Sequence, residues 1–216
     1  MSFDPQSHYQ NATVARNYDH ERFSSLAGRF FQNVERKTLE QMLSVLPHGS
    51  SLLDVPVGTG RIAEVLLDRG FRVMAADISN EMIDVARERI AKLGGNLPAL
   101  RASADSLPFP DGSFDAVVSM RFLPHISSEP RRLMLKEMAR VSRRWVIFSN
   151  SYSDYWHRRR RTIKHWLGHQ APTRFPVTAQ ELKTELNTAK LREVKRLWTF
   201  PFLSEEILVL CEKISG

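Results

Sequence analysis

Strand-like and helix-like patterns alternate along the chain from about residue 35 to residue 150, and this alternation limits the folds open to it. Short apolar strand patterns occur at 51–55, 71–76, 97–102, 113–119 and 145–149, and amphipathic helical patterns lie between them. Strands that are separated by helices pair in parallel, because each crossover helix returns the chain to the same end of the sheet. The sequence therefore predicts an α/β protein.

The end of the chain departs from this alternation. Two further strand patterns, at 190–200 and 206–213, are separated by only five residues. A link this short requires antiparallel pairing, because a parallel pair needs a long crossover. We expect a Rossmann-like, doubly wound, mostly parallel sheet of seven strands, with an antiparallel final strand and helices on both faces.

The composition excludes several classes of protein. The 216 residues contain one cysteine, Cys211, so no internal disulfide or cysteine zinc cluster can form. The first residues, 1–5, are neither basic nor apolar and show no signal-peptide pattern, and no apolar run is long enough to span a bilayer, so we expect a soluble cytoplasmic protein. The net charge of +7 favours anionic partners.

The most informative motif lies where the first strand pattern ends. Asp54 is followed by the turn Gly58-Thr59-Gly60, and a second acid, Asp77, ends the next strand pattern. Glycines allow a sharp turn and a close approach of ligand to backbone. A carboxylate at the tip of the second strand suits the two hydroxyls of a ribose. The motif therefore predicts an adenosine-containing cofactor and no metal.

A nicotinamide cofactor is an alternative, because Gly58, Gly60 and Ala63 also satisfy the dinucleotide fingerprint. Three observations count against it. Little chain remains for a second substrate domain, the closing antiparallel strands are unusual in a dehydrogenase sheet, and Asp54 suits a cationic ligand better than a pyrophosphate.

The segments Asp54–Gly60, Asp77 and Ala104–Asp115 together resemble the motifs of class I S-adenosylmethionine (SAM)-dependent methyltransferases. The small-molecule group that includes ubiquinone/menaquinone-biosynthesis methyltransferases is the most similar. The resemblance implies that SAM is the cofactor and that it is bound by Asp54, Val55, Pro56, Gly58, Thr59, Gly60, Asp77, Ile78, Met82, Ser103, Ala104, Asp105 and Met120.

Two positions depart from the family's pattern. Pro56 stands where a glycine is usual, and Ser103 stands where an aspartate often contacts the adenine amino group. Proline lacks an N–H group and fixes φ, whereas serine can still accept a hydrogen bond. These departures leave a non-catalytic SAM-binding module as a further alternative.

The resemblance also divides the chain, which we expect to be one domain over residues 1–216. Residues 1–33 form a helical N-terminal cover, 34–150 the SAM-binding core, 151–189 variable helices on the acceptor side, and 190–216 the closing strands. Arg121 and His125 follow the fourth strand pattern, where active-site groups of such sheets collect. The resemblance implies that Arg121 or Phe122 lies near the sulfonium and the acceptor, and His125 could act as a general base.

Residues 152–167 form a basic amphipathic pattern. Its aromatic residues include Tyr155 and Trp156, and its cations include Arg158, Arg160 and Arg161. Such a helix could contact a membrane surface, receive an anionic acceptor, or simply cover the domain. Nucleic acid is less favoured, because no separate binding module is visible. We expect methyl transfer to a small-molecule or lipid-linked acceptor.

Overall fold

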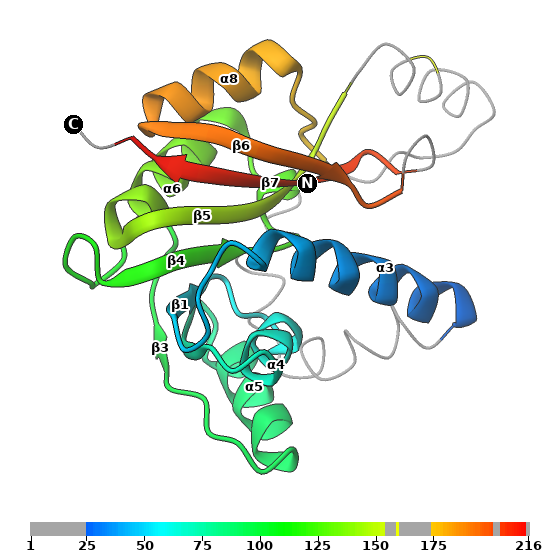
Figure 1. The fold of residues 1–216 in the computed structure, drawn as a ribbon, viewed down its shortest axis with the longest axis vertical. Helices are drawn as coiled ribbons and strands as arrows, with labels where there is room; N and C mark the ends of the chain where they lie inside the picture. The colour runs from blue at the N-terminus through cyan, green and yellow to red at the C-terminus, as the bar shows by residue number, and fades with distance from the viewer. Residues whose placement is uncertain (1–24, 154–158, 160–173, 201–203, 215–216) are drawn as a thin grey trace.

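The computed structural model describes residues 25–153, 159, 174–200 and 204–214, and these form one sheet covered by helices on both sides (Figure 1). The strand order is β3-β2-β1-β4-β5-β7-β6. Strands β1 to β5 pair in parallel, and β7 is antiparallel to both β5 and β6. The predicted fold class is therefore confirmed. The strands are β1 (Ser51–Asp54), β2 (Arg72–Asp77), β3 (Ala99–Arg101), β4 (Phe114–Ser119), β5 (Ser142–Ser151), β6 (Leu191–Trp198) and β7 (Glu206–Lys213).

Two cores lie on the two faces of the sheet. Successive residues of a strand point to opposite faces, and accordingly Leu52 packs in one core while Leu53 packs in the other. The first core holds α3 (Leu26–Leu43), α4 (Arg61–Asp68) and α5 (Asn80–Lys92), and the second holds α6 (Ser128–Val141) and α8 (Ala179–Thr188), as Figure 1 shows.

The helix ends follow local signals in the sequence. The Ser79 hydroxyl accepts a hydrogen bond from the Met82 N–H at 3.1 Å and caps α5. At α8, the Thr178 hydroxyl accepts from the Glu181 N–H, and the Glu181 carboxylate accepts from the Thr178 N–H. This reciprocal pair is a capping box. These caps fix where each helix leaves the sheet.

Some boundaries differ from the sequence patterns. Strand β5 begins at Ser142, directly after α6, although Arg143 and Arg144 gave no strand signal. Pairing of Phe114 with Ser142 extends the strand there, so a tertiary contact decides the boundary. A short 3-10 helix at Leu123–His125 was also not expected. Of the predicted N-terminal cover, residues 25–33 are described, and those from Leu26 onward are helical.

Replacing Phe148 by alanine should destabilise the fold strongly. Phe148 lies in the middle of β5 and is 0% exposed, so the substitution removes a large buried ring and leaves a cavity. We expect the free energy of unfolding in urea to fall by about 3–5 kcal/mol. Val194→Ala on β6, where the side chain is 49% exposed, should change it by less than about 1 kcal/mol. Equal losses in the two variants would contradict the assignment of Phe148 to the core.

Candidate functional site

A cavity of about 520 Å³ opens at the carboxyl ends of β1, β2 and β4. This volume lies within the range of about 300–1,000 Å³ that is usual for small-molecule sites. The structure brings most of the predicted site residues into its wall. They are Val55, Pro56, Gly58, Thr59, Asp77, Ile78, Met82, Ser103, Ala104, Asp105, Met120, Arg121 and His125.

The glycine turn between β1 and α4 forms the floor of this cavity. Gly58 and Gly60 have φ angles of 52° and 79°, in the left-handed region that favours glycine. A Cβ at Gly60 would lie 2.9 Å from the Cα of Ala86 in α5, whereas one at Gly58 would meet no atom within 4 Å. Gly60 therefore allows two helices to pack closely, and Gly58 leaves open space beside the backbone for a ligand.

Asp77 connects the tips of the two neighbouring strands. Its Oδ2 accepts a hydrogen bond from the Gly58 N–H at 2.9 Å, and its Oδ1 accepts one from the Ser79 N–H at 3.0 Å. Burial raises the pKa of the Asp77 carboxyl, while these backbone donors lower it. The carboxylate thus fixes the glycine turn and still reaches the cavity wall, where its remaining lone pairs can accept hydrogen bonds from a ligand.

Asp54 lies behind the cavity wall and does not line it. Its side chain is 0% exposed, and neither carboxylate oxygen has a hydrogen-bond partner with good geometry among the described residues. Burial raises the pKa of Asp54 well above its usual value, the charge of Asp77 raises it further, and the nearby Ala63 N–H opposes the rise. Any effect of Asp54 on a ligand therefore acts through the turn above it. Gly60 likewise lies outside the wall.

One end of the cavity has the character of a nucleoside site. The half-buried Ile78 follows Asp77 directly, and its carbonyl accepts a hydrogen bond from the Arg101 Nε at 2.9 Å. Met82 on α5 and the segment with Ser103 and Ala104, which follows β3, complete this end. A flat apolar base can pack between such walls, with polar groups at its edge.

The opposite end combines Phe122, which the resemblance placed near the sulfonium and the acceptor, with residues that the sequence did not indicate as site residues. Its apolar wall consists of Phe122, Ile126, Pro130, Met134 and Phe175. Phe175 lies about fifty residues from the others in sequence, and no local motif marks it. Its place is fixed by a hydrogen bond from its N–H to the Pro124 carbonyl at 2.8 Å.

A charged pair also lies at this end. The Arg121 Nε donates to the Glu35 Oε1 at 2.5 Å, and Glu35 comes from α3. Arg121 has a φ of 59°, which is uncommon for a residue other than glycine, and its N–H donates to the Ser149 hydroxyl at 2.6 Å. Such backbone conformations concentrate at functional sites. Glu35 shows that α3 contributes directly to the cavity.

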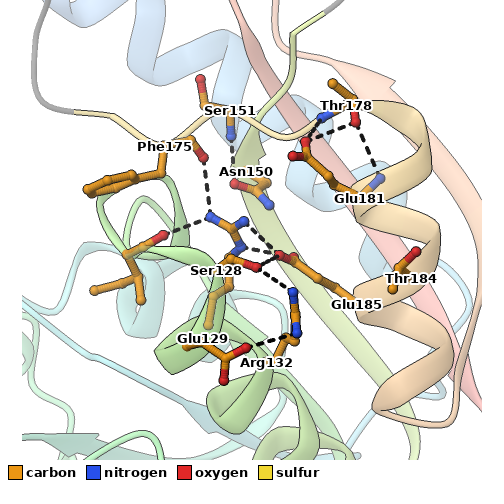
Figure 2. Close-up of polar contacts among 12 residues, drawn as sticks. Ser128, Glu129, Arg132, Asn150, Ser151, Phe175, Thr178, Glu181, Thr184 and Glu185 are labelled. Atoms are coloured by element: carbon orange, nitrogen blue, oxygen red, sulfur yellow. Dashed lines mark hydrogen bonds and ion pairs between the residues drawn. The ribbon is translucent and has the colours of Figure 1, made fainter.

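A buried ion pair holds the apolar wall together. Arg131 on α6 donates two hydrogen bonds to the Glu185 carboxylate on α8, at 2.9 and 2.7 Å. It also donates to the carbonyls of Ile126 and Phe175. Figure 2 shows these contacts around Glu185, with Phe175 on the far side of the same cluster. One guanidinium therefore connects three segments of the acceptor end.

The predicted substrate contacts cannot be placed. Tyr155, Trp156, Arg158, Arg160 and Arg161 lie outside the described residues, so the basic amphipathic helix stays a prediction. Within the described part of the chain, no group of three or more His, Cys, Asp or Glu side chains could hold a metal ion.

The central part of the chain is similar to known proteins. Residues 52–144 match a family model described as a methyltransferase domain. The tRNA (carboxymethyluridine(34)-5-O)-methyltransferase alkbh8 of Xenopus tropicalis is 30% identical over 136 residues, which are 62% of this chain and 20% of that protein. The ubiquinone/menaquinone biosynthesis C-methyltransferase UbiE of Pseudomonas entomophila is 34% identical over 130 residues, 56% of this chain and 50% of that protein.

A third relative and a solved structure extend this comparison. The phosphatidylethanolamine N-methyltransferase of Cereibacter sphaeroides is 37% identical over 130 residues, 58% of this chain and 61% of that protein. This chain thus matches between 20% and 61% of the length of these relatives. The fold is similar to magnesium protoporphyrin IX methyltransferase (ChlM) of Synechocystis PCC 6803, with a TM-score of 0.74, 15% identity and coverage of 94% and 100% of the two chains.

Asp54 makes stability depend on pH. Because its pKa is raised in the folded state, its contribution to stability is full below its usual value of 3.8 and is lost as the pH rises toward the folded-state pKa. We expect Asp54→Asn to flatten the fall in unfolding free energy that begins as the pH rises above about 4, measured in urea without cofactor.

Asp115→Asn is the matched control, with the opposite sign. The Ser51 N–H and the Arg143 guanidinium lower the pKa of Asp115, so this group stabilises the fold at neutral pH and loses that contribution as the pH falls. Parallel pH profiles for the wild type and Asp54→Asn would contradict the buried, poorly paired state of Asp54.

Proposed function

The chain belongs to the class I SAM-dependent methyltransferases, and on that premise we propose that it transfers a methyl group from SAM to a small-molecule or lipid-linked acceptor. The observation that carries the proposal is the cavity itself. One end, at Asp77, has a lining that suits a nucleoside, and the other end, at Phe122 and Phe175, is apolar. Two ligands can therefore meet in one cavity.

The residues present fit SAM as the cofactor of this family. The Asp77 carboxylate reaches the wall beside the glycine turn, where it suits two ribose hydroxyls. Ile78 and Met82 offer apolar packing for adenine, and Ser103 offers a polar group at its edge. The open space beside Gly58 leaves room for the methionine part.

The chemistry asks little of the protein beyond geometry. When bound, SAM supplies a methyl group on a sulfonium, which is already activated for displacement. The side chains need only hold the two partners in line and exclude water. The largely apolar wall of the acceptor end meets this requirement. It therefore does not favour the alternative of a non-catalytic SAM-binding module.

His125 is the proposed general base, for an acceptor that must lose a proton. It lies in the wall of the acceptor end, on the 3-10 helix after β4, and neutral histidine can accept a proton near neutral pH. Arg121, held by Glu35, is proposed to orient the acceptor.

The apolar wall favours a small or lipid-linked acceptor over RNA. The relatives include proteins named for a quinone pathway and for phosphatidylethanolamine, and also one named for tRNA. A membrane-surface contact through residues 152–167 remains part of the proposal. No helix among the described residues is long and apolar enough to cross a membrane.

Asp77→Ala should weaken cofactor binding. Loss of the hydrogen bonds to the ribose should lower the affinity for S-adenosylhomocysteine by about tenfold or more, measured by calorimetry. Asp77→Asn distinguishes disruption of the glycine turn from loss of the negative charge. Its amide oxygen can still accept one backbone hydrogen bond, but the side chain carries no charge. Asp111→Ala, at a carboxylate that is 78% exposed, should leave the affinity unchanged. Unchanged affinity in Asp77→Ala would remove Asp77 from the site.

Transfer of a labelled methyl group tests the reaction itself. Incubation of the protein with methyl-labelled SAM and cell extract should label a lipid or small-molecule fraction, and His125→Ala should lower the rate if a base is required. Label found only in RNA would contradict the proposed acceptor class. Tight binding of NADH without SAM binding would contradict the reaction class.

A further inference from the structure

A second cavity, of about 230 Å³, adjoins the first at the acceptor end. Arg121 and His125 line both cavities, so these two side chains form the boundary between them. Phe31 of α3 and Pro124 contribute apolar surface to the second cavity. A ligand with an apolar part could therefore extend from one cavity into the other.

Arg174 lines this second cavity, and it has no hydrogen-bond or ion-pair partner among the residues that the structure describes. The side chain is partly buried, its Nε is fully buried, and no hydrogen bond or ion pair is formed by it among the described residues. Withdrawing a guanidinium donor from water without replacing the lost hydrogen bond is unfavourable. The structure thus contains a cation that a bound anion would stabilise.

The backbone that follows Arg174 is held by hydrogen bonds, which keep this residue beside the cavity. The Phe175 N–H donates to the Pro124 carbonyl, and the Phe175 carbonyl accepts from the buried Arg131 at 3.2 Å. Two residues on, the Val177 N–H donates to the Ser151 carbonyl at 2.8 Å. A cation whose backbone is held at the edge of a cavity needs to order only its side chain when it binds an anion.

The other charges that line the second cavity leave Arg174 available. Arg121 is paired with Glu35, and His125 can donate a hydrogen bond from its ring. Glu206 is the one acid among the described lining residues, and it forms no ion pair with Arg174. Neither Glu35 nor Glu206 therefore forms an ion pair with Arg174.

We propose that Arg174 binds an anionic group of the acceptor, a carboxylate or a phosphate, in the second cavity. The body of the acceptor would pass Arg121 and His125 and present its reactive atom in the first cavity. This inference rests on the proposed function and narrows its substrate class to amphipathic anions. It assigns the anion to Arg174, which the sequence did not indicate, and it does not depend on the arginines at 158–161.

The test uses phenyl phosphate as the probe and benzyl alcohol as its neutral counterpart, each titrated into the full chain saturated with S-adenosylhomocysteine. NMR chemical shifts should show saturable binding of phenyl phosphate and weaker binding of benzyl alcohol. Arg174→Gln should weaken phenyl phosphate binding by about tenfold or more, because a charge-assisted hydrogen bond is lost. Arg174→Lys should retain part of the affinity.

Two controls bracket this result. Arg143→Gln makes the same substitution at an exposed arginine near the opposite ends of the strands, and it should leave phenyl phosphate binding unchanged. Glu206→Gln removes a negative charge from the cavity and should strengthen that binding. No binding by the wild type, or equal binding by Arg174→Gln, would overturn the anion site.

Further measurements distinguish a lipid headgroup from a soluble phosphate as the source of the anion. They also distinguish failure of the anion site from failure of the proposed function. If the anion is a lipid headgroup, vesicles of phosphatidylcholine with added phosphatidic acid should bind the wild type more than Arg174→Gln. If it is a soluble phosphate, only phenyl phosphate should show that difference. If the wild type binds phenyl phosphate but not S-adenosylhomocysteine, the proposed function alone is overturned. If it binds S-adenosylhomocysteine but not phenyl phosphate, the anion site alone is overturned.

Discussion

The Asp77 carboxylate is the contact on which the cofactor end of the cavity depends. It accepts the Gly58 N–H with one oxygen and the Ser79 N–H with the other, so a single buried group joins the turn after β1 to the start of α5. Gly60 lets α5 approach closely enough for this to occur. The geometry of that end follows from a carboxylate and a glycine-containing turn that are fixed against each other.

The acceptor end is built differently. Its walls come from α3, the segment after β4, α6 and the segment before α8, and long-range polar contacts hold them together. Arg131 joins Ile126, Phe175 and Glu185, and Glu35 holds Arg121. Removing one member of such a buried pair leaves an uncompensated charge. The shape of the acceptor end is therefore tied to the packing of the whole second face.

This difference explains what the sequence could and could not predict. The order of elements, the antiparallel final strand and the cofactor end arise from patterns that are local in sequence, and they were predicted together with Asp77 and Ser79. Glu35, Arg174 and Phe175 reach the cavities only through tertiary packing, and no spacing or motif marks them. Asp54 was predicted at the cofactor site, yet its carboxylate lies beneath the turn, because strand geometry points it into the core.

A crystal structure of the protein with S-adenosylhomocysteine tests the central claim most directly. The ribose hydroxyls should lie within hydrogen-bond distance of the Asp77 carboxylate, with adenine packed beside Ile78 and the amino acid part over the Gly58 turn. Density for the ligand outside this cavity, or a nucleoside with no contact to Asp77, would contradict the assignment of the site.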